Sequence, residues 1–505
     1  MKSTLTKLLA LSLALLLLLS LFAACTTAED DPKDTTAKTD APDATEAPTE
    51  GETEPADDVL TVMPENNKGE EILILMGKSS GTKETCLAPS EERVPQALYE
   101  RNADIEEYLG ITLAYNIENS DAWADRADYN DVVRNDVMNE HKADIIVAQI
   151  SSTFMTCVEE NLITDLSQVE AFNFKAPWWF GNLTEVFSIN GKQFGAMGDV
   201  SMSTYSGLQA IWFNADMSKN YQIESPYDAV RSNTWTLEKL IENGKKVEET
   251  VDGEYDPLKN KMGLLALHTS NRTWIAALDL HLVDHDPNTG VVTVPTAPKE
   301  KLVEVFDLMF DTFDKENEFY VHNKYAENRA AFKAGTVLYL LDSLSSVSGF
   351  RDMEDDYGLV PMPKYEAKQE KYFTVGGNLV WMLPSTATEK NNELSAKVME
   401  VMGYLNRQDV VPEYYDITLG MTLARDENVQ EMLAHIRAGA VIRWEYVFDR
   451  VFNPSIWNCL QMDDGCRHPA PEKVNRAHGD NVTTWWAYNQ QTWSNAVKAL
   501  YEKLR

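Results

Sequence analysis

The sequence lacks an apolar run long enough to cross a lipid bilayer. Its longest such run, from Leu8 to Phe22, falls short of the roughly 20 residues that a membrane-spanning helix needs. Positive charge is also scarce, because 45 Lys and Arg residues stand against 80 Asp and Glu residues, which gives a net charge of −35. A chain this acidic is a poor match for nucleic acid or anionic lipid surfaces, so we expect no nucleic-acid partner.

Cysteine is scarce as well, with five residues in the whole chain, and their spacing does not match a zinc knuckle. Cys459 and Cys466 enclose a short segment that fits either a disulfide-closed loop or two free thiols. The nucleophile elbow, the phosphate loop and the dinucleotide fingerprint are all missing, so we expect no cofactor and none of the catalytic residues of those motifs. Carboxylate pairs suited to glycoside hydrolysis stay open as an alternative, since 80 acidic residues form pairs by chance.

The segment around His281 and His285 looks at first like a metal site. The two histidines have the spacing of zinc ligands on a helix, but no Glu stands in the metalloprotease position and Pro287 ends any helix. The following Asp and Asn residues imitate a calcium loop, yet Pro295 occupies the position where that loop needs Glu. We interpret the stretch as a hairpin turn before a strand at 291–294, and we expect no metal.

The N-terminus has the parts of a secretory signal. Lys2 and Lys7 precede the apolar run, and small residues follow it before Cys25. From 26 to 58 the chain is built of Thr, Ala, Pro, Asp and Glu, with 12 acidic residues and two lysines. Such a composition cannot bury enough apolar surface to fold, and charge repulsion keeps it extended.

The residues before Cys25 resemble a bacterial lipoprotein box, with Phe22 where Leu is usual. The resemblance implies a signal peptide at 1–24, a lipidated (palmitate-bearing) Cys25 as mature N-terminus, and a disordered acidic tether over 25–58. An ordinary signal peptide with a chance cysteine is the alternative. The expected location is the extracellular face of a bacterial cell membrane, to which the protein is held through its lipid.

The remaining 59–505 is too long for one core, and its patterns predict two α/β lobes. Short buried runs that read as strands alternate with amphipathic segments that read as helices, in the order β-α-β-α-β, at 71–77, 94–109, 111–117, 128–139 and 143–148. This order indicates a parallel sheet with helices on both faces. The same pattern returns later, with helices at 301–313, 395–405 and 430–438 and a strand at 337–341.

A series of modest motifs, taken in order, carries a resemblance across roughly 70 to 505. They are Ala143–Ser152, Glu160–Leu166, Asn190–Asp199, Ile211–Met217, Thr234–Leu240, Phe332–Asp342, Tyr357–Pro363 and Val375–Gly377. Met197 departs from the pattern, which usually has Pro. Together these motifs resemble the extracellular solute-binding proteins of ABC importers, in the carbohydrate-binding group related to maltose-binding protein.

The resemblance implies a two-lobed clamp of the periplasmic-binding-protein kind, in which each lobe is a mostly parallel sheet flanked by helices. Lobe 1 would comprise 59–200 plus 378–425, and lobe 2 would comprise 201–377 plus 426–505. The chain would cross between lobes after Asp199, near Gly376–Asn378 and near 420–430. It also implies a non-enzymatic monomer that captures a sugar or oligosaccharide between the lobes and delivers it to an ABC permease. A lipid-anchored glycoside hydrolase, or a lipoprotein of similar shape that binds peptide or metal, are the alternatives.

Candidate ligand contacts follow predicted strands, because ligands of open parallel sheets lie beyond the carboxyl ends of strands. Ser151 and Ser152 follow the strand ending at Ala148, and Asp199 offers a carboxylate that can accept two sugar hydroxyls. Asn271 and Trp274 fit either a polar contact beside a stacking ring or a helix cap with a core tryptophan.

Three further candidates come from later segments. Asp342 ends a strand at a point where the related proteins often carry an aromatic residue. Gly377 permits close backbone approach to a ligand or a hinge bend. Trp457 is the C-terminal aromatic that the resemblance allows at the site.

Overall fold

The computed structural model describes residues 60–120, 126–247, 258–267, 270–286, 289–315, 319–321, 324–415, 428–460 and 482–504. Every described residue belongs to one compact unit, Pro55–Arg505. The predicted signal peptide, Cys25, the tether, Cys466 and most of the third crossing lie outside the described residues. Among the described residues, no helix is both long enough and apolar enough to cross a membrane.

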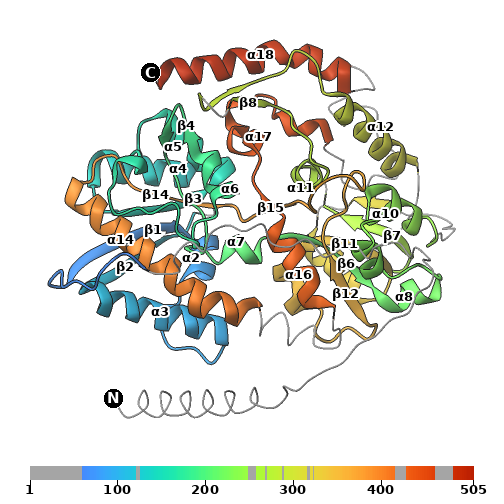
Figure 1. Cartoon of the computed structure of the whole chain (residues 1–505), viewed down its shortest axis with the longest axis horizontal. Coiled ribbons are helices and arrows are strands. Elements are labelled where there is room, and N and C mark those ends of the chain that lie inside the picture. Colours follow the sequence, from blue (N-terminus) through green and yellow to red (C-terminus); the bar gives the residue numbers. More distant parts are fainter. Residues whose placement is uncertain are drawn as a thin grey trace, which may run out of the picture. The chain divides into compact units, whose positions relative to one another are not determined.

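The first sheet has four strands in the order β14-β3-β1-β2 (Figure 1). The strands are β1 (Glu70–Gly77), β2 (Ile111–Glu118), β3 (Ile145–Gln149) and β14 (Leu379–Met382). β1 pairs in parallel with both β2 and β3, whereas β14 runs antiparallel to β3. The expected β-α-β-α-β order is therefore confirmed, and a strand from far along the chain completes the sheet.

Helices cover this sheet. They are α2 (Lys78–Glu84), α3 (Arg93–Leu109), α4 (Arg126–Asn135) with the π-helical turn η1 (Asp136–Glu140), η2 (Ile150–Phe154), α5 (Met155–Glu159) and α14 (Glu389–Leu405). Of these, α3, α4 and α14 lie where the sequence predicts helices. α3 ends at Gly110, whose φ of 60° lies in the left-handed region that glycine adopts without strain. The predicted helix stop at Gly110 is confirmed.

The second sheet has five strands in the order β10-β7-β11-β6-β12. They are β6 (Gln209–Asn214), β7 (Met262–Ala266), β10 (Phe319–Val321), β11 (Val337–Ser343) and β12 (Tyr357–Val360). β7 pairs in parallel with β10 and β11, while β6 is antiparallel to both of its neighbours. The predicted α/β fold with two mostly parallel sheets is confirmed.

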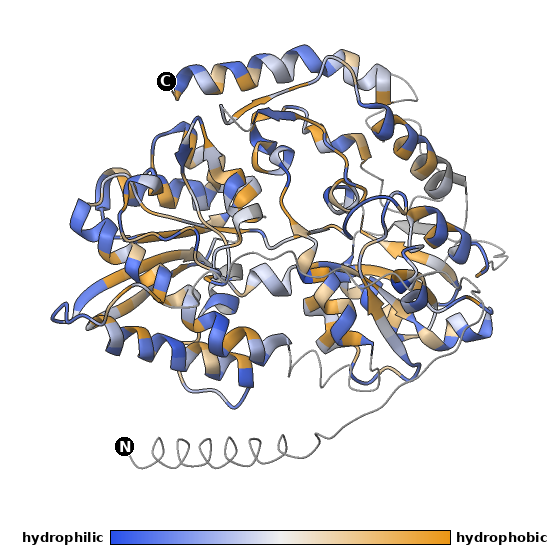
Figure 2. Cartoon of the chain, viewed as in Figure 1, coloured by the Kyte–Doolittle hydropathy of each residue, from blue (hydrophilic) through white to orange (hydrophobic). Residues whose placement is uncertain are grey.

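The helices next to the second sheet in sequence are α8 (Ala215–Asn220), α9 (Pro226–Arg231), α10 (Leu237–Gly244), α11 (Asn271–Ala277), α12 (Glu300–Lys315), α13 (Tyr325–Lys333) and η6 (Leu344–Gly349). Trp235 precedes α10 and is fully buried, with its indole N–H donating to the carbonyl of Pro361 at 2.8 Å. It is a core residue. Figure 2 shows that the central strands of this sheet are mostly hydrophobic, which fits a sheet covered by helices.

Short elements join and extend the sheets. They are η3 (Leu166–Gln168), α6 (Gly181–Thr184), η4 (Glu185–Phe187), β4 (Ser188–Ile189), β5 (Lys192–Gln193), α7 (Ser203–Ser206), β8 (Asp284–Asp286), β9 (Val291–Thr293), β13 (Thr374–Val375) and η7 (Asn406–Val410). The C-terminal part adds α16 (Val429–Ala438), β15 (Ala440–Val441), α17 (Trp444–Val447), η9 (Asp449–Val451), η10 (Ile456–Leu460) and α18 (Val482–Lys503). β8 and β9 form the antiparallel pair of the hairpin that the sequence predicts.

A buried carboxylate ties α14 to the segment before the first crossing. Glu400 is fully buried and accepts the indole N–H groups of Trp178 at 2.6 Å and Trp179 at 2.8 Å, together with the backbone N–H of Asn173 at 2.7 Å. Burial raises the pKa of Glu400 to about 7, although these three donors favour the charged form. The paired tryptophans are thus core residues held by one carboxylate.

We predict that Glu400 makes the fold less stable as the pH rises from about 5 to 7. Because its pKa is higher in the folded state than in the unfolded chain, unfolding releases a proton in this range, which costs about 3 kcal/mol of stability by pH 7. Urea unfolding of wild type and Glu400→Gln across this pH range measures the difference. Glu393→Gln, on the same helix and accepting two backbone N–H groups, is the control. If the free energy of unfolding changes equally with pH in the wild-type protein and in Glu400→Gln, the prediction is wrong.

Candidate functional site

Described residues line a cavity of about 720 Å³. Its walls come from three separate segments: 185–188 in η4 and β4, 281–299 around the β8–β9 hairpin, and 441–445 from β15 into α17. The volume falls in the range of about 300–1,000 Å³ that is usual for small-molecule sites. The first segment belongs to predicted lobe 1 and the second to predicted lobe 2.

One wall of the cavity is aromatic. The rings of His285 and Trp444 stack with centroids 4.1 Å apart and an interplanar angle of 17°, and Phe448 packs edge-on against Trp444. Burial lowers the pKa of His285, so its imidazole is neutral at pH 7 and has one donor and one acceptor nitrogen. A flat ring surface beside polar ring nitrogens suits a ligand with both apolar faces and hydroxyl groups.

The rest of the lining is polar and of mixed charge. Lys299 pairs with Asp284 at 2.7 Å, and Arg443 pairs at 2.6 Å with Asp279 just behind the wall. His281 also contacts Asp279 at 3.2 Å, and this hydrogen bond, followed by the charge of Arg443, lowers the pKa of Asp279. These pairs fix the orientation of the charged groups before any ligand arrives.

Glu445 is the most buried ionisable group of the lining. It is 3% exposed, and its Oε1 has no hydrogen-bond partner among the described residues. Burial raises its pKa, with Arg443 acting in the opposite direction.

Groups of His, Cys, Asp and Glu that could hold a metal ion are not found in the described part of the chain. With three carboxylates against two cations, the lining best suits a neutral polar ligand.

The predicted residues of the first sheet are buried beside this region. Ser151 and Ser152 lie in η2, directly after β3, and are 6% and 1% exposed. The carbonyl of Ser152 accepts from Asn130 at 3.2 Å and from the Arg450 guanidinium at 2.9 Å. The position of Ser151 and Ser152 directly after a strand was therefore predicted correctly. The C-terminal segment 444–460 packs against this position.

Two of the other predicted residues, Asn271 and Trp457, contact each other, and Trp274 lies in the same helix as Asn271. Asn271 and Trp274 lie in α11, and the side-chain amide of Asn271 donates to the carbonyl of Trp457 at 3.0 Å. All three are less than 9% exposed. The segment 444–460 thus contacts both predicted groups, through Arg450 on one side and Trp457 on the other.

Asp342 and Gly377 lie apart from the cavity lining. Asp342 forms a two-pronged ion pair with Arg329, with distances of 2.6 and 3.0 Å. At Gly377, a Cβ atom would stand 2.5 Å from the carbonyl oxygen of Ser203, so only glycine permits this approach of backbone to backbone. Gly377 therefore has a packing role between the segment before β14 and α7.

Asp199 is buried at the start of the first crossing, where the chain leaves the first sheet. Its carboxylate accepts the Tyr205 hydroxyl and lies 3.3 Å from Nη1 of Arg407. Burial raises its pKa to about 6, against the opposing effect of the Tyr205 hydrogen bond and of two arginines, Arg437 and Arg407. Its partners here are protein groups.

Sequence reasoning missed the aromatic pair that lines the cavity. The β8–β9 hairpin was predicted, and His281 and His285 were noted only as metal candidates. The contact of His285 with Trp444 joins residues about 160 positions apart, and no local pattern indicates such a pairing. The signal in the sequence that could have indicated this wall is the predicted hairpin with its nearby histidines and alternating acidic residues.

No protein-family profile and no curated protein match the chain. Three solved structures are similar to it, each with a TM-score of 0.48 and covering 86% of this chain. They are an ABC substrate-binding protein from Listeria monocytogenes in complex with cycloalternan (13% identity), an ABC transporter solute-binding protein from Thermotoga lettingae bound with α-D-tagatose (13%), and the maltose/maltodextrin-binding domain MalE from Bdellovibrio bacteriovorus bound to maltotriose (14%). The match spans 99%, 98% and 99% of those chains, respectively.

We predict that Asp199→Ala destabilises the fold by about 2–4 kcal/mol, because it leaves the buried Tyr205 hydroxyl without its acceptor and removes the buried carboxylate beside Arg407. Chemical denaturation measures the loss. Asp228→Ala, which removes an exposed partner of Arg231, is the control and should leave stability unchanged. A wild-type midpoint for Asp199→Ala would show that the carboxylate has no structural role.

Proposed function

We propose that the protein is a solute-binding protein that captures a neutral sugar or oligosaccharide in the 720 Å³ cavity and delivers it to an ABC permease. The observation that carries the proposal is the His285–Trp444 stack on the wall of a cavity with a polar, mixed-charge lining. A sugar ring presents an apolar face, which an aromatic ring covers, and hydroxyls, which carboxylates, imidazoles and cations bind. The ordered motifs between 143 and 377 support the same function independently.

Ligand capture follows from the placement of the three wall segments. Because 185–188 and 281–299 lie in different predicted lobes, a ligand that contacts both favours the conformation in which they are close. Predicted lobe 1 comprises 59–200 plus 378–425, and predicted lobe 2 comprises 201–377 plus 426–505. The protein acts as a monomer, since one chain supplies all three walls.

We predict that Trp444→Ala weakens sugar binding about tenfold, which corresponds to about 1.4 kcal/mol of lost stacking energy. Isothermal titration calorimetry against neutral hexoses and their di- and trisaccharides measures the affinity. Tyr488→Ala removes a 64% exposed aromatic ring on α18 and is the matched control, while Trp444→Phe should recover part of the affinity. If the Trp444→Ala variant binds sugar with the wild-type affinity, the ligand lies elsewhere.

Turnover distinguishes this function from the glycoside hydrolase alternative. After prolonged incubation with a saturating oligosaccharide, a binding protein returns the sugar unchanged. Chromatography of the incubated sugar measures this. Hydrolysis products that increase with protein concentration would support the hydrolase instead.

We also propose that Cys25 is lipidated and holds the protein at the outer face of the cell membrane. The basis is the short apolar run that ends at a cysteine and is followed by an acidic segment without a core. Cys25→Ser should move the protein from the membrane fraction into the medium, and Cys86→Ser should leave it membrane-bound. Retention of Cys25→Ser at the membrane would refute lipid anchoring.

A further inference from the structure

The long C-terminal helix α18 contacts the β8–β9 hairpin that forms one wall of the proposed sugar cavity, although no described residue of the helix lines that cavity. In Figure 1 the helix lies along the top of the molecule, with β8 and α17 below it. Its buried side chains recur with the helical period, so one face packs against the protein. Two indole groups fix this face: Trp486 donates to the carbonyl of Pro295 at 2.9 Å, and Trp493 to that of Pro454 at 2.7 Å.

Tyr501, near the end of α18, binds the hairpin through its hydroxyl group. The hydroxyl donates to the carbonyl of Gly290 at 3.0 Å and accepts the backbone N–H of Val292 at 2.9 Å. Val292 is fully buried and is the cross-strand partner of His285. One hydroxyl thus satisfies two backbone groups of the hairpin and fixes the strand that pairs with His285.

The ring of Tyr501 also supports Trp444, through one intermediate ring. Tyr501 stacks on Phe448 with centroids 6.4 Å apart and an interplanar angle of 28°, and Phe448 packs edge-on against Trp444 at 6.2 Å. Phe448 is fully buried and close-packed, so a change on one side of its ring is felt on the other. Tyr501 is therefore connected to both members of the stacked pair, to Trp444 through Phe448 and to His285 through the hairpin backbone.

The end of α18 joins the hairpin to the first wall segment as well. Leu504, which continues the helical hydrogen-bond pattern, accepts the side-chain amide of Asn190 on its carbonyl at 3.3 Å. Asn190 lies in the turn between β4 and β5, just after the wall segment 185–188. The hairpin turn lies beside this turn, since a Cβ atom on Gly290 would stand 3.7 Å from the backbone nitrogen of Asn190. Tyr501 and Leu504 thus hold two walls of the cavity from one turn of helix.

We propose that Tyr501 is a positioning residue of the proposed sugar cavity, which holds the His285 and Trp444 rings parallel to each other. The inference rests on the proposed function, in which this ring pair is the surface that a sugar covers. Both rings are only partly buried, so contacts from outside the cavity are needed to keep their orientation. A binding surface whose orientation is fixed in advance loses less entropy when the ligand arrives, and it binds more tightly for that reason.

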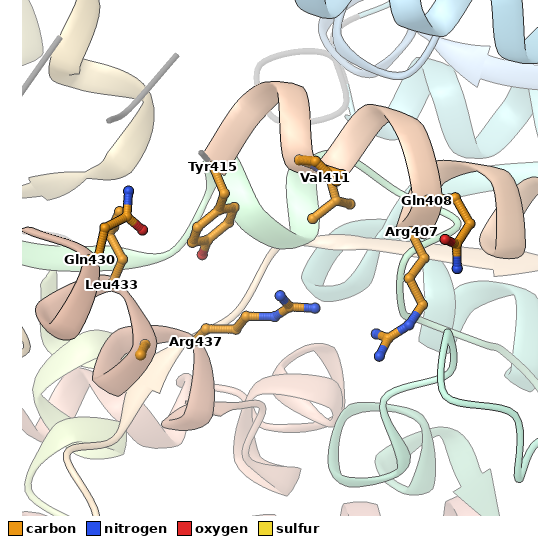
Figure 3. A pocket seen from close by; sticks show the side chains of 9 residues that line it. Arg407, Gln408, Val411, Tyr415, Gln430, Leu433 and Arg437 are labelled. Atoms are coloured by element: carbon orange, nitrogen blue, oxygen red, sulfur yellow. The ribbon is translucent and has the colours of Figure 1, made fainter. Parts of the chain in front are cut away.

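A second cavity, of about 370 Å³, provides an internal comparison (Figure 3). It lies between η7 with the residues after it and α16, and its lining includes Arg407, Val411 and Gln430. The two linings have no residue in common. The contacts of Tyr501 described above lead to the cavity beside Trp444, so a change at Tyr501 should alter binding there and leave the second cavity unaffected.

The ring protons of His285 test the proposal without any ligand, because the ring current of a stacked indole shifts their NMR signals upfield. In full-length protein with ¹³C-labelled histidine, studied at one fixed pH, the signal that His285→Gln removes is assigned to this residue. Tyr501→Phe should reduce its upfield shift, since loss of the hydroxyl releases the hairpin. Tyr488→Phe, which removes a hydroxyl from an exposed ring on the same helix, should leave it unchanged. An unchanged His285 signal in Tyr501→Phe overturns the proposal, whether or not the protein binds sugar.

Calorimetric titration with the neutral hexoses and their di- and trisaccharides gives the second measurement. Tyr501→Phe should weaken binding of the tightest-binding sugar about threefold, because the ring pair is no longer fixed in advance. In the Trp444→Ala background the same substitution should have no further effect, since a residue that acts through the ring pair then has nothing to position. Gln430→Ala, in the lining of the second cavity, should leave the affinity unchanged.

The two measurements separate failure of this proposal from failure of the proposed function. If the wild-type protein binds sugar and Tyr501→Phe binds it equally well, or if the effects of Tyr501→Phe and Trp444→Ala simply add, Tyr501 does not position the rings and the proposed function stands. If the wild-type protein binds no sugar of the series, the proposed function fails. The His285 signal then still decides whether Tyr501 holds the ring pair.

Discussion

The structure depends on how the chain is held where it leaves the first sheet for the second. The fully buried Asp199 starts this crossing, and its backbone carbonyl accepts the Asn406 amide at 2.7 Å. Three residues on, the buried carboxylate of Glu84 accepts the backbone N–H groups of Met202 at 2.7 Å and Ser203 at 2.9 Å. A crossing without these acceptors would leave backbone and side-chain groups unpaired in the interior, at a cost of about 1–3 kcal/mol each. The hydrogen bonds to these acceptors therefore constrain the path of the crossing.

The same constraint positions the proposed sugar cavity. The second passage between the sheets begins at β13, which pairs in parallel with β15, so the chain at 440–441 runs alongside it. From there the segment 441–445 enters the cavity wall and presents Trp444 to the β8–β9 hairpin. The cavity is thus assembled from parts far apart in sequence, whose meeting is set by the crossings.

The sequence allowed most of the first sheet to be predicted, because its strands and helices are local patterns: the apolar run at 71–77, the 3.6-residue periodicity before Gly110, and the run ending at Ala148. β14 as the partner of β3 could not be predicted in this way, since it joins residues about 230 apart. Ser151 and Ser152 follow β3 and Asp342 lies near the end of β11, as predicted, yet the structure packs the segment 444–460 against Ser152 and Asn271, and no local pattern indicates this packing. Asp199 and Asp342 illustrate a further difficulty: a buried carboxylate suits a ligand and an arginine equally well.

The most direct test of the account is a crystal structure of the protein with a bound neutral sugar. The account predicts that the sugar ring lies against the aromatic pair of His285 and Trp444, with hydroxyls bonded to groups of all three wall segments. A sugar bound instead at Asp342, with the space beside Trp444 occupied by solvent alone, would contradict it.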